Sequence, residues 1–440
     1  MNEDFLQFIW NYKLYDPSSL KTNTGETVEI LSAGSRNRDS GPDFHDAKIK
    51  IGDTLWVGSV EIHVKASEWY VHGHHDDKAY RNVILHVVTH DDALVRRSGG
   101  EILPTLKISY SEAVGKRYAE LSESRSEIPC AEHVAKVDSF KFSFWLNRLA
   151  TERLERKTAE INELLDRTLN DFEEVFHFVL FRAFGFKTNA LPFEMLARSL
   201  PCRLLRKYSR SLFQLEALLF GRAGFLERDD IEDEYYRRLK SEFSFLRYKH
   251  ELAPMDNSIW KYSKLRPVNF PTVRIAQVAS LLNRHEQLWE TILALDDMRH
   301  IRSLFDVCAS EYWDSHYLFG KTAAKPSPKN IGTTTTDSLM INLAAPMLFA
   351  FAARRGEDEL KEKSLHLLEI VPPEINRHIA EWNKCNIKPR NALESQALLH
   401  LKSEYCARSK CLNCVAGKEI IQNLPDTEYY KEKTTNAIYL

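Results

Sequence analysis

Residues 41–63 read GPDFHDAKIKIGDTLWVGSVEIH, and this stretch decides how the N-terminal part of the chain is expected to fold. It opens with Gly-Pro-Asp-Phe, continues through two strand-like runs and ends in Val-Glu-Ile-His. The order places Asp43 before one β-strand and Glu61 and His63 inside the next. Because side chains two apart on a strand point to the same face, Glu61, His63 and Lys65 should line one face while their neighbours enter a core. This face could hold a divalent cation.

The strand pattern continues on both sides of this stretch through the first 111 residues. Alternating or β-branched apolar runs predict five strands, at residues 27–33, 47–51, 55–65, 82–89 and 103–109. Helices are expected at residues 4–12 and 76–81. The predicted order therefore begins helix, three strands, helix, strand, and the strand at 103–109 follows.

The pattern changes after a connecting segment at residues 112–138. From residue 139 to 252 apolar residues recur with a period of 3.6, and strand signals nearly vanish. The sequence thus predicts an α+β protein, with an N-terminal sheet domain over residues 1–111 and a large α-helical region over residues 139–440. The apolar run at 338–353 is too short to span a membrane comfortably and is predicted to be a buried helix.

An internal repeat is expected in the helical region. Trp260 followed by RPVN at 266–269 is echoed by Trp382 followed by KPRN at 388–391, and each precedes a predicted helix. The echo could be two similar helix entries with an asparagine near the cap, or a shared ligand role.

Composition excludes several classes of function. The 440 residues carry a formal net charge of −2, so the chain lacks the basicity of a non-specific nucleic-acid coat. Acidic residues stand where a signal peptide would be basic, and no apolar segment follows them, so a cytoplasmic location is expected. Seven cysteines without an export signal argue against a disulfide framework. No phosphate-binding loop, Gly-x-Ser-x-Gly elbow or His-Glu-x-x-His helix is present in the sequence.

Several motifs of the N-terminal region resemble known families. They are Gly41-Pro42-Asp43-Phe44, Gly58-Ser-Val-Glu-Ile-His63, Trp69 with His72-Gly-His-His75, and the run from Tyr80 to Val88. Together they resemble a bacterial family of roughly full-chain relatives that carries only a domain-of-unknown-function label. An acid opening the second strand and Glu-x-basic in the third also resemble the PD-(D/E)xK nuclease-like superfamily, over about a quarter of the chain.

The superfamily resemblance implies a metal site. Asp43 and Glu61 would bind one or two Mg²⁺ or Mn²⁺ ions together with the backbone carbonyl of Ile62, since phosphodiester hydrolysis needs a cation to polarise the phosphoryl oxygen and acidify water. Where the superfamily has lysine, this chain has His63, and Lys65 lies one pleat further along the same face. His63 could orient or deprotonate the water, bind a softer metal such as Mn²⁺, or mark an inactive relative.

Histidines are concentrated in the same region, with seven of the chain's 16 between residues 45 and 90. His72, His74 and His75 could form a transition-metal site, contact a phosphate backbone, or belong to a polar turn capped by Asp76. His86 is expected to be a satisfied core histidine whose position allows it to face His63.

A second cluster of candidate ligands is Cys406-x4-Cys411-x2-Cys414. These thiols could hold zinc or an iron–sulfur cluster, with Cys385 or His400 as the fourth ligand, or they could carry no metal. The remaining thiols, Cys130, Cys202 and Cys308, are isolated and expected in the core.

Candidate nucleic-acid contacts outside the site are Arg203, Arg206, Lys207 and Arg210, four bases in a segment without acids. They could contact phosphates or simply form a solvated helix face.

Three functions follow from these residues. The leading hypothesis is metal-dependent hydrolysis of DNA or RNA, with Asp43 and Glu61 as ligands and His63 or Lys65 serving the water. One alternative is a catalytically inactive module that binds nucleic acid or protein. The other is a histidine-rich metallohydrolase that acts on a small substrate.

Overall fold

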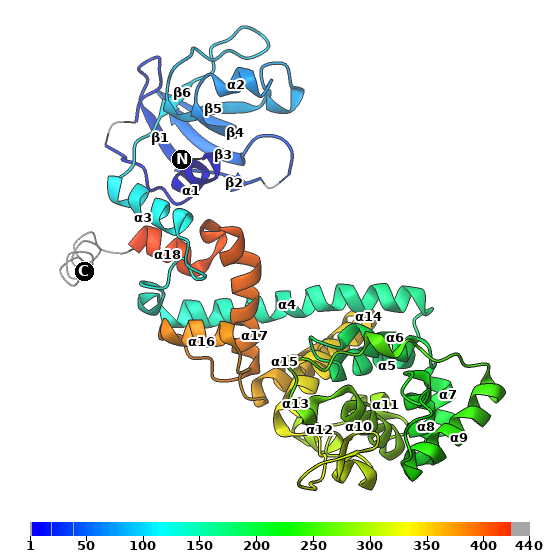
Figure 1. Ribbon diagram of the computed structural model, residues 1–440. Helices are drawn as coiled ribbons and strands as arrows, with labels where there is room; N and C mark the ends of the chain where they lie inside the picture. Colours follow the sequence, from blue (N-terminus) through cyan, green and yellow to red (C-terminus); the bar gives the residue numbers. More distant parts are fainter. Residues whose placement is uncertain (1, 19, 38, 424–440) are drawn as a thin grey trace. The chain divides into compact units, whose positions relative to one another are not determined.

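The computed structural model describes residues 2–18, 20–37 and 39–423 (Figure 1). The described residues form two compact units. The first contains residues 2–143, 384–387 and 401–423, and the second contains residues 144–383 and 388–400. A mixed sheet lies in the N-terminal part of the chain and a large helical region follows it, which confirms the predicted α+β class.

The sheet of the first unit has six strands in the order β1-β3-β4-β5-β6, with β2 paired to β3. Strands β1, β3 and β4 are antiparallel neighbours, whereas β5 runs parallel to β4 and β6 parallel to β5. A parallel neighbour needs a crossover connection, which the segment containing α2 supplies between β4 and β5. The strands are β1 (Val28–Ser32), β2 (Ser35–Arg36), β3 (Phe44–Ile51), β4 (Thr54–Lys65), β5 (Val83–His90) and β6 (Thr105–Lys107).

The second half of β4 is the buried centre of the sheet. From Gly58 to His63 every residue of β4 is buried, because β3 and β5 flank it and both α1 (Glu3–Asn11) and α2 (Glu68–Val71) contact it. Helix α1 starts at Asn2, whose side chain accepts a hydrogen bond from the Phe5 amide. Its apolar side chains then enter the core. Polar side chains on this part of β4 therefore lie in an enclosed environment.

Strand β3 carries a bulge beside this centre. Its register with β4 shifts between Phe44 and Ala47, and Asp46 there has a left-handed φ of 57°. Phe44 nevertheless pairs with Val60. This pairing brings Asp43, just before β3, next to Glu61, just after Val60.

Three predicted elements differ from those observed by more than one residue at an end. The strand predicted at 103–109 covers only Thr105–Lys107. The strand predicted at residues 47–51 begins three residues earlier, at Phe44. The helix predicted at 76–81 is only a 3₁₀ turn, Lys78–Tyr80, which is capped by Asp77 rather than Asp76. Helix α2 before it was not predicted, because a single turn anchored by Trp69 is too short to show a helical period.

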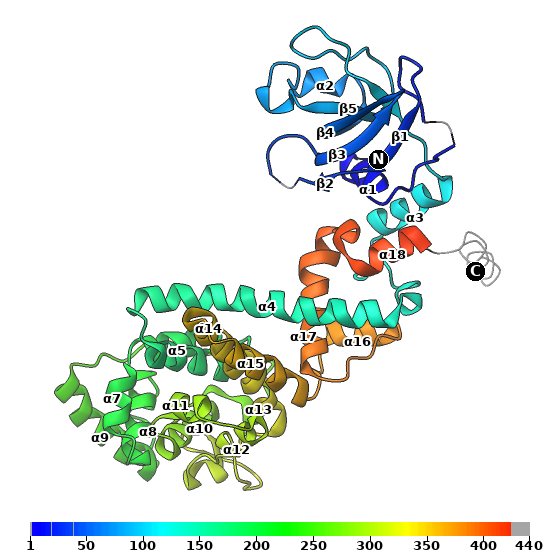
Figure 2. The same ribbon diagram turned by 180° about the vertical axis from the view of Figure 1, so that it is seen from behind.

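The first unit is completed by α3 (Glu112–Glu123), the 3₁₀ turn Val134–Lys136, and the C-terminal segment that ends in α18 (Val415–Asn423). Figures 1 and 2 both show α3 and α18 side by side, and the two helices are in contact. The Glu419 side chain also accepts a hydrogen bond from the amide of Asp138 at 2.8 Å. Segments far apart in the sequence therefore pack together in this unit.

The second unit is built from helices and a short hairpin. Its first helix, α4 (Ser139–Arg167), confirms the predicted change to helical periodicity at residue 139. The further helices are α5 (Phe172–Phe184), α6 (Ala190–Arg198), α7 (Cys202–Lys207), α8 (Leu212–Arg222), α9 (Glu234–His250), α10 (Pro271–Arg284), α11 (Leu288–Leu293), α12 (Ile301–Leu304), α13 (Thr333–Leu339), α14 (Ala345–Arg355), α15 (Asp358–Ile370), α16 (Arg377–Lys384) and α17 (Ala392–His400). The hairpin consists of β7 (His316–Leu318) and β8 (Lys321–Thr322).

The predicted buried helix at residues 338–353 is confirmed. Helices α13 and α14 join through a π-helical turn, Met340–Ala344, just before Pro346, a residue that cannot donate a backbone hydrogen bond. The continuous helix Thr333–Arg355 is long and apolar enough to cross a membrane, but 78% of its most apolar window is buried inside the structure.

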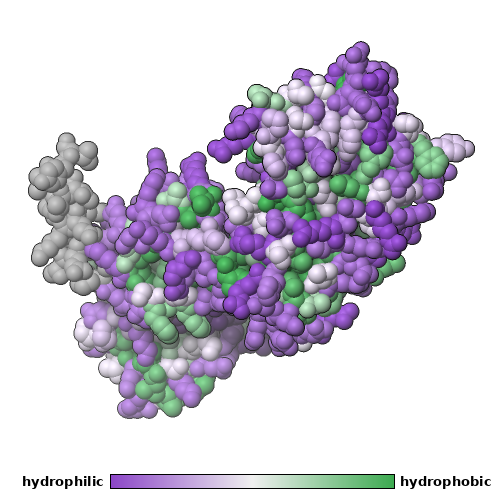
Figure 3. Space-filling model, turned by 90° about the horizontal axis from the view of Figure 1, so that it is seen from below, coloured by the Kyte–Doolittle hydropathy of each residue, from purple (hydrophilic) through white to green (hydrophobic). Residues whose placement is uncertain are grey.

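On the face shown in Figure 3, hydrophilic residues predominate and hydrophobic residues form smaller patches between them.

The two halves of the predicted repeat use their asparagines differently. Asn391 caps α17 by accepting a hydrogen bond from the Glu394 amide at 3.0 Å. Asn269 instead accepts from the Arg274 guanidinium at 2.6 Å, and α10 begins at Pro271. The backbone differs as well, since Pro267–Asn269 forms a 3₁₀ turn and residues 388–391 do not.

Candidate metal centre

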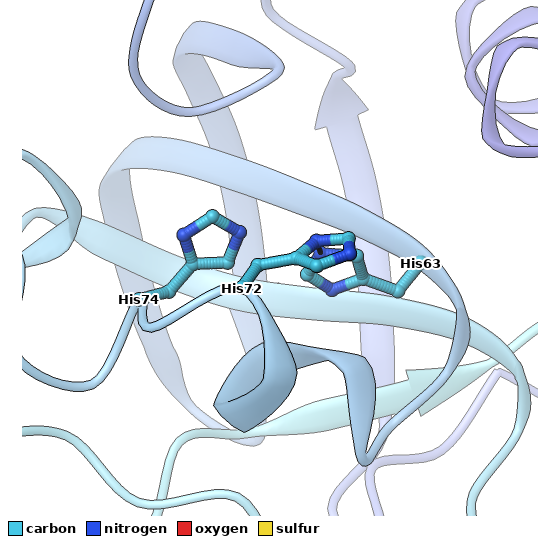
Figure 4. Close-up of side chains that lie close together, drawn as sticks. All are labelled: His63, His72 and His74. Carbon is cyan, nitrogen blue, oxygen red and sulfur yellow. Dashed lines mark hydrogen bonds between the residues drawn. The ribbon is translucent and has the colours of Figure 1, made fainter.

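Strand β4 carries two polar side chains into the buried part of the first unit. Glu61 is 5% exposed and His63 only 1%, and the two lie on one face as the strand period predicts. His72 and His74 approach the same place from the loop after α2, and Figure 4 shows their rings gathered around that of His63. The three histidines each offer a nitrogen within 4.8 Å of the others.

The ligand atoms of these side chains lie close together. His63 Nε2 lies 3.1 Å from His72 Nδ1 and 3.6 Å from Glu61 Oε1. Glu61 Oε1 is also 3.2 Å from His74 Nε2. His72 is exposed while His63 and Glu61 are buried, so the cluster is enclosed by the core on one side and reaches solvent at His72.

Asp43 lies directly beside Glu61. Its backbone amide donates a hydrogen bond to Glu61 Oε2 at 3.1 Å, and its own Oδ2 accepts one from the Ile62 amide at 2.9 Å. Burial raises the pKa of both carboxyl groups, and the charge of Glu61 raises the pKa of Asp43 further. The predicted pairing of the two acids is therefore present, and both are held in fixed positions.

Helix α1 adds two side chains that the sequence reasoning missed. Gln7 donates a hydrogen bond to Asp43 Oδ1 at 2.6 Å, and Glu3 Oε1 lies 3.9 Å from His63 Nε2. Burial raises the pKa of Glu3 as well. The signal was present as a Glu-x3-Gln spacing on one helix face, but only the packing of α1 on β4 shows where that face points.

His86 supports His63 from the neighbouring strand. His86 Nε2 lies 2.8 Å from His63 Nδ1, which confirms that the two rings face each other. Burial lowers the pKa of His63 to about 2 and that of His86 to about 3, so both rings are neutral. His86 Nδ1 has no hydrogen-bond partner among the described residues, so the prediction of a satisfied core histidine holds for only one of its nitrogens.

Aromatic rings hold His74 in place. Its imidazole stacks on Tyr80 with ring centroids 3.8 Å apart, and the buried Trp69 ring meets it at 5.4 Å. Burial, followed by the nearby charges of Glu61 and Asp43, raises the pKa of Tyr80 to about 12. Tyr80 is thus a neutral wall of the site that sequence reasoning did not single out as a site residue.

Two predicted site residues are not brought to the cluster. Lys65 is exposed at the end of β4, and its charge acts on Asp92 instead. The ring of His75 packs against Tyr70, and its Nε2 lies 3.3 Å from Asp76 Oδ2. Among the described contacts, none joins either residue to Glu61 or His63.

The predicted nucleic-acid contacts belong to the second unit. Arg206, in α7, forms an ion pair with Glu173. Arg203, Lys207 and Arg210 are exposed. Their role in phosphate binding stays a prediction.

The three C-terminal cysteines lie in the first unit. Cys406 belongs to a 3₁₀ turn, Cys411 to a second one, and Cys414 directly precedes α18. Of the two residues considered as a fourth ligand, Cys385 belongs to the first unit and His400 to the second.

The comparison with known families covers most of the chain. Residues 3–377 match the family described as "Protein of unknown function (DUF2851)". The chain belongs to this family. No curated protein and no solved structure matches it. The match includes the histidine–carboxylate cluster, which consists of Asp43, Glu61, His63, His72 and His74, and it ends before the C-terminal cysteines. The family description states no activity, so the chemistry of the site is the basis for a functional proposal.

Proposed function

We propose that this DUF2851 protein is a metal-dependent phosphodiesterase that acts on nucleic acid, with its divalent ion held by Glu61, His63, His72 and His74. The observation that carries the proposal is the spacing of their ligand atoms, 3.1, 3.2 and 3.6 Å. Two ligands of one tetrahedral ion at about 2.1 Å lie about 3.4 Å apart. The observed distances fall on both sides of that value.

The donor set favours a transition metal. Imidazole nitrogens suit Mn²⁺ or Zn²⁺, whereas Mg²⁺ prefers oxygen ligands and bound water. His63 is neutral because of its burial, so it has no proton to lose before binding. His74 Nε2 is buried and forms no hydrogen bond among the described residues, although Glu61 Oε1 lies 3.2 Å away, and this arrangement suits two ligands of one ion.

The surrounding side chains fix the ligands. When His63 Nε2 binds an ion, its ring hydrogen must lie on Nδ1, and His86 Nε2 is placed 2.8 Å away to accept it. The amide of Asp43 holds Glu61 through its second oxygen. A bound divalent ion would neutralise the phosphoryl oxygens and acidify a water molecule.

Asp43 is the residue best placed to accept a proton. Its carboxyl group lies beside the ligand set, is held by Gln7 and the Ile62 amide, and has a raised pKa because of burial and the charge of Glu61. A raised pKa makes a carboxylate a stronger base near neutral pH. We therefore assign the water-activating role to Asp43 and not to Lys65.

The substrate class rests on the order of elements. The order of elements in the first unit resembles that of the PD-(D/E)xK nuclease-like superfamily. It consists of helix α1, the antiparallel strands β1, β3 and β4, helix α2 and the parallel strand β5. Asp43 stands before β3 and Glu61 inside β4, at the positions of that superfamily's two acids. These features support a phosphodiester substrate.

A second candidate function is favoured by the three histidines, which outnumber the carboxylate ligands. In this version the same ion serves a hydrolase that acts on a small substrate. The ligand set would be unchanged, and only the substrate would differ.

The test combines metal binding with hydrolysis. Labelled single-stranded, duplex and branched DNA, and RNA, are incubated with the protein and Mg²⁺, Mn²⁺ or Zn²⁺, and the wild type is compared with Glu61→Gln and His72→Ala. His75→Ala is the matched control, since it removes a histidine from the same loop but outside the cluster. We expect cleavage with Mn²⁺ or Zn²⁺ that Glu61→Gln and His72→Ala abolish and His75→Ala retains.

Other outcomes separate the alternatives. Cleavage that survives Glu61→Gln and His72→Ala would show that the site is wrong. Mn²⁺ binding lost in both variants, without cleavage of any nucleic acid, would reject the nuclease proposal in favour of a small substrate or a binding module.

A further inference from the structure

A fourth cysteine lies with the three C-terminal ones. Cys130 stands in the turn after α3, where its carbonyl accepts hydrogen bonds from the amides of His133 and Val134 at 3.0 and 2.8 Å. It is buried, with 7% of its surface exposed. Sequence reasoning placed it in the core as an isolated thiol, yet it belongs to the same compact unit as Cys406, Cys411 and Cys414.

The C-terminal cysteines are presented by a tightly folded segment. The carbonyl of Cys411 accepts the Cys414 amide at 3.2 Å, and that of Cys406 accepts the Ser409 amide at 3.1 Å. Gly417, in the first turn of α18, packs so closely on the Cys411 carbonyl that a Cβ would not fit. Cys411 and Cys414 are buried, and Cys406 is partly so. Their positions are thus fixed by the backbone.

The two segments that carry the four thiols lie side by side. Ile128, Pro129 and Ala131, on either side of Cys130, line one pocket together with Ile420 of α18. Cys130, Cys411 and Cys414 are buried, and Cys406 is partly buried. The four thiols therefore belong to one buried region of the first unit.

We infer that Cys130, Cys406, Cys411 and Cys414 form a four-thiolate site that binds an iron–sulfur cluster. Four cysteine thiolates are the ligand set of such clusters, and plant-type ferredoxins share the C-x4-C-x2-C run, although their fourth cysteine follows the run whereas Cys130 precedes it. Structural zinc sites are instead commonly built from two separate Cys-x2-4-Cys pairs. Here three cysteines lie in one run and the fourth stands alone.

The surroundings suit bound thiolates. Cys414 directly precedes α18, whose positive dipole end favours a thiolate. Lys402, four residues before Cys406, forms an ion pair with Glu127, three residues before Cys130. This ion pair connects the two cysteine-bearing segments.

The site would join two segments that are far apart in the chain. Cys130 belongs to the turn after α3, and the other three ligands belong to residues 406–414. Contacts between α3 and α18, and the hydrogen bond from the Asp138 amide to Glu419, connect the same two segments. The cluster would therefore fasten the C-terminal segment to the first unit, and this role does not depend on the proposed hydrolase activity.

The first test measures the cluster in the full-length protein. Purified without oxygen, or reconstituted with Fe²⁺ and sulfide, the wild type should contain iron and acid-labile sulfide and absorb visible light through sulfur-to-iron charge transfer. Cys130→Ser should lose most of all three signals, whereas the matched controls Cys202→Ser and Cys308→Ser in the second unit should keep them. Full iron and sulfide content in Cys130→Ser would refute its role as a ligand.

A second test avoids the risk that a cysteine variant does not fold. The native wild type is treated with iodoacetamide before and after the cluster is removed, and mass spectrometry locates the modified cysteines. Cys130, Cys406, Cys411 and Cys414 should be protected together and become reactive together. Modification of Cys130 while the cluster is intact, or zinc in place of iron and sulfide in the protected protein, would overturn the proposal.

Discussion

The two candidate metal sites of the first unit are built in opposite ways. Glu61, His63, His72 and His74 come from a short stretch of sequence, and the cluster reaches solvent at His72. The four-cysteine site draws ligands from segments far apart in the sequence, and three of its four thiols are buried. Catalytic metal sites keep a position open for substrate, whereas structural sites are closed by protein ligands.

This difference separates the expected roles. Ligands from one strand and its following loop can be positioned by a small part of the fold, so their loss should change chemistry more than stability. Ligands that join distant segments stabilise the fold itself, because binding of the metal is then part of folding.

The largest effect is expected at Glu61. Glu61→Gln keeps the shape of the side chain but removes the charge that binds the ion, so the initial rate of nucleic-acid hydrolysis should fall about a thousandfold, or about 4 kcal/mol in activation free energy. The iron content of the cysteine site should be unchanged. If iron is lost together with activity, the two sites are not independent.

The next effect concerns stability. Cys411→Ser should lower the free energy of unfolding by about 3 kcal/mol in the cluster-loaded protein, because the metal no longer joins the two segments. His72→Ala should change it by less than about 1 kcal/mol, since the His72 side chain is exposed. Denaturant unfolding curves of both variants and the wild type give the comparison. Equal losses would contradict the division into open and closed sites.

The local periodicity of the sequence predicted part of the histidine–carboxylate site. The two-residue repeat of β4 puts Glu61 and His63 on one face in any sheet, and the sequence therefore identified them. The contact between Asp43 and Glu61 also followed from two neighbouring antiparallel strands. His72 and His74 were proposed as ligands from their spacing, and the fold brings them to His63.

The unpredicted residues depend on packing between distant segments. Glu3 and Gln7 reach the site only because α1 packs on β4, and no period in the sequence states which strand a helix covers. Cys130 belongs to no spacing motif, so its place in the same unit as the C-terminal cysteines comes only from the tertiary fold. Lys65 was a candidate by strand period, but the strand ends there and the side chain is exposed.

The free energy of unfolding of the chelated, metal-free protein should depend on pH through the buried acids and histidines of the candidate metal centre. Burial raises the pKa of Asp43 and Glu61 to about 8, so their protonated forms stabilise the fold fully below the unfolded pKa of about 4, and this contribution is lost as the pH rises through about 8. The lowered pKa values of His63 and His86 act oppositely, but only below about pH 6.5, where the unfolded rings gain protons.

Between about pH 6.5 and about pH 8 the contribution of Asp43 and Glu61 falls, whereas that of His63 and His86 is constant. Glu216, whose pKa is raised to about 7 by burial, also titrates in this range, so the double variant Asp43→Asn, Glu61→Gln is the reference. Relative to this variant, the free energy of unfolding of the chelated wild type should fall by about 1 kcal/mol or more, measured by thermal unfolding at several pH values. An equal slope in the double variant would assign the titration to other groups.

The smallest effect is expected at Tyr80, which contacts the ligand set of Glu61, His63, His72 and His74 only through His74. Tyr80→Ala removes the ring that stacks on His74 at 3.8 Å, so the loop ligand becomes less well ordered and Mn²⁺ affinity should fall about fivefold. Tyr80→Phe keeps the stack and should bind Mn²⁺ within about twofold of the wild type. Titration calorimetry of the two variants distinguishes stacking from the hydroxyl group. Equal weakening in both would mean that the hydroxyl, and not the ring, positions His74, whereas no weakening in either would show that the Tyr80 stack is not needed for Mn²⁺ binding.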